Sequence, residues 1–205
     1  MDDSYGGGGW TLVAVSSDDG TDTWTWDNRI YWESADTTFG SLDFLDQDFR
    51  SEAYDDLTIE DLLFVHYPSG VWAQYDGVGD GTTTLGEIIE AVGERNYYLS
   101  TDGYEMTDGT LSTSGTRLCS TNLVFNACGQ DARSSCNTDN DDSHGPTWSV
   151  DLNHGCPYDE ANYGALGTSY NTPSSELDTV GFGAYGGLNT GASGTGENRM
   201  EIYIR

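Results

Sequence analysis

The chain contains no lysine. All seven of its basic residues are arginines, and they stand against 35 aspartates and glutamates. The resulting formal net charge of -28 repels nucleic-acid phosphates and anionic membrane surfaces, so both are poor partners for this protein. We expect most of the acids to form a solvated surface and only a handful to bind cations.

Long apolar runs and catalytic motifs are also missing. No apolar stretch approaches the roughly 18 residues of a membrane-spanning helix, and no signal peptide is visible at the N-terminus. The sequence has no Gly-x-Ser-x-Gly elbow, no metalloprotease helix and no lysine for a Schiff base or phosphate loop. Its only histidines are His66, His144 and His154; we expect His66 to be a structural residue with its hydrogen bonds satisfied. These absences predict that the protein is not an enzyme.

Cysteine is scarce but clustered. The four cysteines, Cys119, Cys128, Cys136 and Cys156, fall in one window of the chain. An even number suits two disulfides, although the sequence leaves their pairing open. A zinc site is the weaker alternative, because no Cys-x-x-Cys pair is present. We therefore predict an oxidising compartment, that is, a secreted or cell-surface protein.

The stretch from Cys136 to Cys156 has the spacing of a calcium loop. Asp139 and Asp141 stand two residues apart, and the carbonyls of Ser143 and Gly145 continue the same spacing. Hard oxygen ligands in this pattern suit Ca2+, which takes about six to eight oxygens at roughly 2.3–2.6 Å. The alternative is a solvated acidic turn closed by a disulfide.

Strand and helix signals are confined mainly to the first half of the chain. Period-two or apolar runs predict strands at Trp10–Val15, Thr23–Trp26, Leu57–Val65 and Met200–Ile204, the last pairing back into the central sheet. Thr84 predicts a helix N-cap, with Glu87 at the third helical position. The segment Leu42–Tyr54 fits either a short helix or an irregular turn. Three tryptophans between Trp24 and Trp32 predict core packing, with a sugar-stacking face as the alternative.

The remainder of the chain is predicted to form loops. Asp76–Gly81 carries a Gly-x-Gly-x-Gly string without the strand and helix of a dinucleotide site. After Leu118 the sequence is rich in glycine, serine, asparagine and aspartate, and we expect cations and disulfides to offset its chain entropy. With 205 residues and no visible linker or repeat, residues 1–205 are predicted to form a single domain. The acidic, lysine-free composition is similar to that of proteins adapted to high salt.

Several strings, taken in order, resemble fibrinogen-like domains. The opening Gly7–Val13 resembles the start of their main body, and the Asp139–Gly145 spacing is similar to their calcium loop. Within that superfamily the closer resemblance is to intelectins, the X-type lectins. It rests on Thr38–Ser41, on Asp48–Phe49 through Tyr54–Asp55 to Asp61–Leu62, on His66–Pro68 and on Cys136–Asp139.

The resemblance implies an α+β fold with a twisted, mainly antiparallel sheet, few helices and a coil-rich, calcium-binding C-terminal half. It also implies a secreted lectin in which a glycan's exposed vicinal diol binds a protein-held Ca2+. The implied ligands of that ion are Asn137, Asp139 and Asn140, with Asp151 as an added acid. Tyr163 and Tyr170 would flank the sugar. The implied ligands of structural calcium are Asp18, Asp19, Asp27, Asp48 and Asp159.

The sequence departs from the intelectin pattern at defined places. Asn140 stands where the family usually has histidine, so coordination there would be by an amide oxygen or would be lost, and Asp151 is shifted by one residue. A cysteine after the Asn-Thr-acid string, an early partner cysteine and the usual N-terminal subdomain are absent. Family positions favour the disulfides Cys119–Cys136 and Cys128–Cys156.

The alternative function is a non-catalytic structural or protein-binding fibrinogen-like module, in which Asp139, Asp141, Ser143 and Gly145 only enclose a structural ion. The sequence leaves the glycan and the oligomeric state open.

Overall fold

The computed structural model describes residues 4–21, 23–24, 28, 30–33, 37–92, 103–112, 121–128, 143–148, 163–164, 181–182 and 197–205. Within them, nine strands form two sheets of order β2-β1-β9-β3-β4-β5 and β6-β7-β8. The first sheet contains β1 (Thr11–Ser17), β2 (Phe49–Arg50), β3 (Leu62–Tyr67), β4 (Val71–Tyr75), β5 (Asp108–Gly109) and β9 (Arg199–Ile204). The second contains β6 (Leu123–Cys128), β7 (Ser143–Trp148) and β8 (Tyr163–Gly164). The helices are α1 (Ile30–Glu33), α2 (Ala53–Asp56) and α3 (Leu85–Val92).

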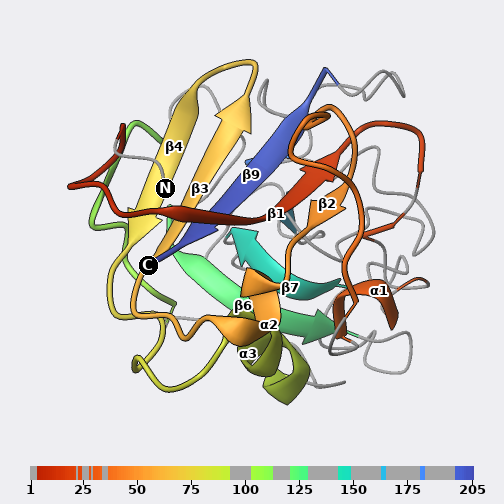
Figure 1. The fold of residues 1–205 in the computed structure, drawn as a ribbon. Coiled ribbons are helices and arrows are strands. Elements are labelled where there is room, and N and C mark those ends of the chain that lie inside the picture. The colour runs from red at the N-terminus through yellow and green to blue at the C-terminus, as the bar shows by residue number, and fades with distance from the viewer. Residues whose placement is uncertain are drawn as a thin grey trace.

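Every strand pair in both sheets is antiparallel, which places the described fold in the mainly antiparallel α+β class that the sequence predicts. The last strand, β9, lies between β1 and β3 near the middle of the larger sheet (Figure 1). Met200 of β9 is opposite Ser16 on one side and His66 on the other. The predicted return of the C-terminal strand to the central sheet is therefore confirmed.

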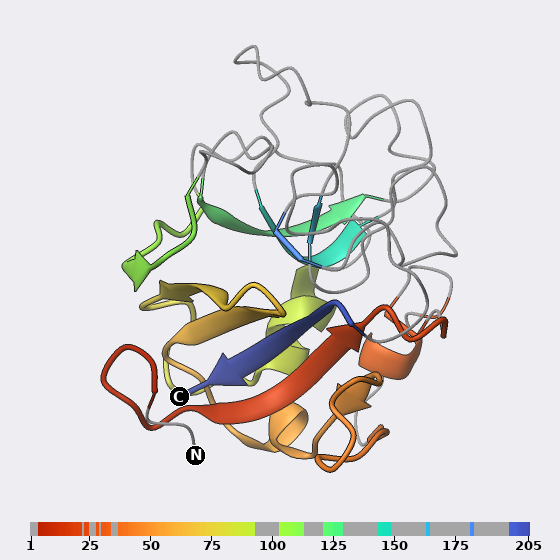
Figure 2. The same cartoon turned by 90° about the horizontal axis from the view of Figure 1, so that it is seen from above.

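The β6–β7 sheet forms a second layer over one face of the larger sheet (Figure 2). Trp148 of β7 joins the layers: its ring packs edge-on against Phe64 of β3 at 4.8 Å, and its indole N–H donates to the Tyr75 hydroxyl at 2.8 Å. Trp24 and Trp32 are also buried in this core. Their burial confirms the predicted core packing for these two tryptophans.

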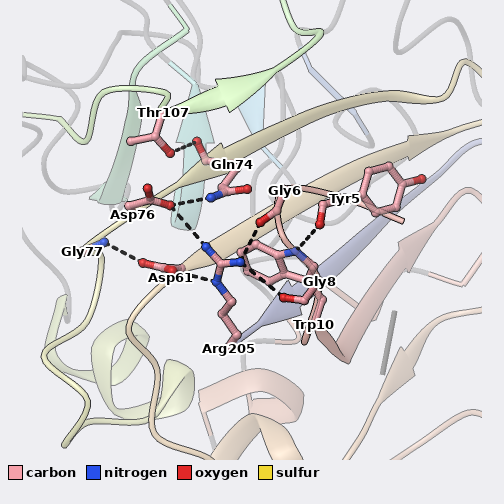
Figure 3. Close-up of polar contacts among 10 residues, drawn as sticks. All are labelled: Tyr5, Gly6, Gly8, Trp10, Asp61, Gln74, Asp76, Gly77, Thr107 and Arg205. Carbon is pink, nitrogen blue, oxygen red and sulfur yellow. Dashed lines mark hydrogen bonds and ion pairs between the residues drawn. The ribbon is translucent and has the colours of Figure 1, made fainter. Parts of the chain in front are cut away.

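The opposite face of the larger sheet carries a smaller cluster of Trp10, Leu63, Val65 and Tyr203. Arg205, just after β9, ties the N-terminal glycine loop to this side (Figure 3). Its Nη1 donates to the Gly6 carbonyl at 2.7 Å, its Nε donates to Asp61 at 2.8 Å, and its guanidinium lies 4.3 Å from the Trp10 ring centre. The resulting Arg205 clamp links residues far apart in the sequence.

Helix α3 begins as the sequence predicts. The Thr84 backbone N–H donates to Glu87 Oε2 at 2.9 Å, and the Glu87 backbone N–H donates to Thr84 Oγ1 at 3.2 Å. This reciprocal capping box satisfies two donors at the helix N-terminus. Leu85 and Ile89 of α3 are buried in the core between the sheets.

We predict that Thr84→Ala lowers the free energy of unfolding by about 1 kcal/mol, because the Glu87 amide loses its acceptor. Urea denaturation would measure the change. Thr84→Ser is the matched control, since serine keeps the capping hydroxyl and should retain most of the wild-type stability. A serine variant as unstable as the alanine variant would show that the cap contributes little.

Other predicted elements differ in position. The segment Leu42–Tyr54 forms turns, the short strand β2 and the start of α2, rather than one helix. Strand β3 begins at Leu62, five residues after Leu57, because Leu57 is exposed and Ile59 pairs with the segment before α3 through Thr83. Trp24 lies in a turn instead of a strand. In the described part of the chain, no helix is long and apolar enough to cross a membrane.

Candidate functional site

A cavity of about 540 Å³ lies among the segment after β1, helix α1 and the loop before β2. Helix α1 and that loop are on the β1–β2 side of the larger sheet (Figure 1). The lining combines two carboxylates, two carboxamides, two hydroxyls, two aromatic rings and a glycine: Asp19, Asp48, Asn28, Gln47, Thr21, Thr23, Tyr31, Phe39 and Gly40. We call it the Asp19–Asp48 cavity.

Backbone amides fix the two carboxylates of this cavity. Asp48 directly precedes β2, is only 6% exposed, and its Oδ1 accepts the Ser17 backbone N–H at 2.9 Å. Its own backbone N–H donates to Asp19 Oδ2 at 3.2 Å, while Asp19 Oδ1 accepts the Thr21 N–H at 2.7 Å. The Asp19 carboxylate is thus held against the backbone of Asp48 by the end of β1. Each Asp19 carboxylate oxygen has two lone pairs and can accept further donors or bind a cation.

The aromatic side of the cavity is supported from the core. Phe39 packs against buried Trp24 with ring centres 5.2 Å apart, and Tyr31 meets Phe39 edge-on at 6.3 Å. The Trp24 indole N–H donates to the Val15 carbonyl of β1 at 2.7 Å. Phe39 also exchanges backbone hydrogen bonds with Arg50 of β2. Tyr31 remains 46% exposed, so the cavity that Asp19 and Asp48 line also has one open aromatic ring.

Gly40 sets the distance between the aromatic side and Asp48. Its φ is +74°, a left-handed conformation that favours glycine. A Cβ at this position would lie 2.2 Å from the Asp48 carbonyl oxygen. The close approach of these two backbone segments therefore requires glycine, and it gives a physical role to the Thr38–Ser41 string of the sequence.

Asp18, Asp19 and Asp48 were all expected to bind structural calcium, and the structure separates them. Asp19 and Asp48 lie side by side in the cavity, whereas Asp18 is fully buried and its Oδ2 accepts the Asn198 side-chain N–H at 2.9 Å. Asp18 does not line the cavity. The expected ligands Asp27 and Asp159 lie outside the described residues.

The donors present in the cavity fit an oxygen-binding cation. Asp19 and Asp48 supply charge, and Asn28, Gln47 and Thr21 add neutral oxygens of the kind that Ca2+ accepts. Among the residues that the structure describes, however, no group of three or more histidine, cysteine, aspartate or glutamate side chains is placed to hold a metal. A cation here would depend on the neutral donors as well as on the two acids.

Most of the predicted glycan-binding residues and calcium-loop ligands lie outside the described residues: Asn137, Asp139, Asn140, Asp141, Asp151 and Tyr170. Ser143 and Gly145 lie in strand β7, opposite Cys128 and Asn126 of β6. Tyr163 lies in β8, opposite Trp148 of β7. Strand β7 therefore contains the last residues of the predicted calcium loop, and it pairs with β8, which contains Tyr163, one of the two residues predicted to flank the sugar. The cysteine pairings cannot be followed, since Cys119, Cys136 and Cys156 fall outside the described residues.

Another buried polar group lies near the end of β1. His66 is 2% exposed; its Nδ1 is hydrogen-bonded to Ser69 Oγ at 2.8 Å, and its Nε2 has no hydrogen-bond partner among the described residues. Burial lowers the pKa of His66 from 6.5 to about 4, and the negative charge of Asp18 opposes that shift. His66 was expected to have both ring nitrogens hydrogen-bonded, but only Nδ1 has a partner among the described residues.

No protein-family model matches the chain, and no curated protein matches it either. The site must therefore be interpreted from its own geometry and from the sequence strings.

Sequence reasoning missed most of the Asp19–Asp48 cavity. Tyr31, Asn28 and Gln47 come from separate segments, and no spacing rule joins them. The available signal was Gly40, between Phe39 and the acidic loop, because glycine is the residue that allows a close approach of two backbone segments. Of the residues that line the cavity, only Asp19 and Asp48 were expected to share a binding site.

Proposed function

We propose that this chain is a calcium-dependent carbohydrate-binding protein of the fibrinogen-like type, acting outside the cell. Its ligand is a glycan with an exposed vicinal diol. The proposal rests on the ordered sequence strings and is supported by the antiparallel β6-β7-β8 sheet. The bound ion would supply open coordination positions for the diol, and the chain's own residues hold the ion and flank the sugar.

The pairing of β7 with β8 is the structural observation that supports this proposal. Strand β7 begins at Ser143, directly after the predicted ion-binding residues, and its last residue, Trp148, is opposite Tyr163. Trp148 is three positions after Gly145 in the strand, which is roughly 10 Å at about 3.3 Å per residue. Tyr163 therefore belongs to the same sheet as the strand that follows the predicted ion-binding loop. Asn137, Asp139 and Asn140, with Asp151, hold the ion in this proposal, and Tyr163 and Tyr170 flank the sugar.

Ser143 and Gly145 favour a second candidate function. In a strand, carbonyls two residues apart point to the same side, so these two would act as a pair of neutral ligands if that side faces away from the paired strand β6. With Asp139 and Asp141 they would enclose a purely structural ion. The protein would then be a non-catalytic structural or protein-binding module.

A glycan array probed with and without Ca2+ tests the first proposal. We predict calcium-dependent binding that Asp139→Ala abolishes, because the variant removes a charged ligand of the ion. Tyr163→Ala should weaken sugar binding while calcium affinity, measured by calorimetric titration, stays nearly unchanged. Asp108→Ala is the matched control, since it removes an exposed carboxylate on edge strand β5.

Two outcomes would contradict the lectin proposal. One is sugar binding that survives calcium removal. The other is a blank array from a protein that still binds calcium and loses thermal stability in Asp141→Ala. The second outcome would establish the structural-calcium alternative, because an ion fully enclosed by Asp139, Asp141, Ser143 and Gly145 has no open position for a diol.

A further inference from the structure

We infer that the Asp19–Asp48 cavity binds one neutral sugar ring. The inference takes from the proposed function only that the ligand is a carbohydrate, and it places a second binding site in the N-terminal half of the chain. It depends on three independent properties of the described cavity: its volume, its exposed aromatic ring and the type of its polar groups.

The volume is too large for a cation alone. Ligand pockets for small molecules measure about 300–1,000 Å³, and this cavity measures about 540 Å³. A calcium ion holds its ligands at roughly 2.3–2.6 Å, so the ion and its ligand oxygens would occupy one part of this space and leave the aromatic side unused. A sugar ring spans both the aromatic side and the acidic side.

Tyr31 offers the apolar surface that a sugar ring requires. The CH groups of a pyranose pack on aromatic faces, which exclude water from them. Tyr31 is 46% exposed, and Phe39 holds it by an edge-on contact at an interplanar angle of 80°. Phe39 is in turn fixed by Trp24. This contact restrains the ring, which lowers the side-chain entropy lost on binding.

The polar groups match sugar hydroxyls, which both donate and accept hydrogen bonds. Asp19 is a pure acceptor held in place by the Thr21 backbone amide, and the carboxamides of Asn28 and Gln47 supply both donors and acceptors. Two carboxylates within a chain of net charge -28 repel uronic and sialic acids. The ligand class is therefore a neutral hexose or pentose unit.

The test uses the full chain in the presence of Ca2+, with neutral methyl glycosides of glucose, galactose and mannose as probes in calorimetric titration. Tyr31→Ala should weaken binding about tenfold, because the stacking face is removed. Gln47→Ala should also weaken it, and because Gln47 is an exposed loop residue, the variant should keep the wild-type fold. Tyr31→Phe should bind nearly as well as the wild type, since it keeps the ring.

Tyr67→Ala is the matched control. Tyr67 is 47% exposed, almost the same as Tyr31, but it lies at the end of β3 and packs beneath Arg199. This variant should leave glycoside binding unchanged. If Tyr31→Ala and Gln47→Ala both bind every glycoside as the wild type does, or if no neutral glycoside binds, the inference is overturned.

The same titrations separate this inference from the proposed function. Binding lost in Tyr31→Ala but retained in Asp139→Ala would support the cavity and reject the calcium-held diol. Binding lost in Asp139→Ala but unchanged in Tyr31→Ala would do the reverse. A cavity that serves calcium alone would be revealed by Asp19→Asn, which would reduce calcium uptake while glycoside affinity stayed the same. That result would also overturn the inference.

Discussion

Replacing Arg205 with alanine is expected to lower the free energy of unfolding by about 3 kcal/mol. The guanidinium donates to the Gly6 carbonyl at 2.7 Å and to Asp61 at 2.8 Å, and it covers the ring of Trp10. Hydrogen bonds that involve a charged group contribute roughly 1.5–3 kcal/mol each. Because the Arg205 side chain is 28% exposed, solvent screening reduces the sum toward the lower end.

Arg199→Ala is the appropriate comparison for the Arg205 clamp. Arg199 also bonds an acid, Glu201 at 2.8 Å, and stacks 3.9 Å from the Tyr67 ring centre. Those partners belong to the sheet itself, so the loss should be about 1 kcal/mol. Arg205→Lys should recover less than half of the stability, since an ammonium lacks the planar fork that serves a carbonyl and a carboxylate together. If Arg205→Ala and Arg199→Ala have equal midpoints in chemical denaturation, this account is contradicted.

A second large effect is expected at low pH. His66 has a folded-state pKa of about 4, below its ordinary value of 6.5, so the folded protein keeps the imidazole neutral where the unfolded chain protonates it. The contribution of His66 to stability is complete above pH 6.5 and is lost as the pH falls toward 4. Between pH 7 and pH 4.5 this loss amounts to roughly 2–3 kcal/mol.

The measurement compares the pH dependence of unfolding in the wild type and in His66→Gln at fixed ionic strength. The acidic surface changes stability in both proteins alike, so their difference isolates the imidazole. Asp18→Asn should lower the pKa of His66 further, because the charge of Asp18 is what opposes the effect of burial. An NMR titration in which the His66 imidazole has a midpoint near 6.5 would rule out the proposed origin of this effect.

Local signals in the sequence were sufficient for several elements. Thr84 and Glu87 determine their own hydrogen bonds within one helical turn, so the start of α3 could be predicted from spacing alone. The apolar runs of β1 and β9 likewise indicated buried strands. In each case the decisive contacts lie within the segment, or the segment is apolar enough to require burial.

Contacts between distant segments could not be predicted in this way. The segment Leu42–Tyr54 offered both helical and irregular patterns, and the pairing of Phe49 with Val15 decided in favour of a short strand. The Arg205 clamp joins Gly6, Asp61 and Trp10, whose proximity follows only from the strand order. The Asp19–Asp48 cavity is hidden for the same reason, because its aromatic and carboxamide groups are brought together by tertiary packing.

The place of β9 in the larger sheet also bears on how the chain folds during synthesis. Strands β1 and β3 are both hydrogen-bonded to β9 and not to each other. Until residues 199–204 leave the ribosome, the β2–β1 pair and the β3–β4–β5 group each carry an unpaired strand edge, which is a template for aggregation. The nascent protein must therefore protect two open edges until β9 has emerged, and its larger sheet can close only from then on.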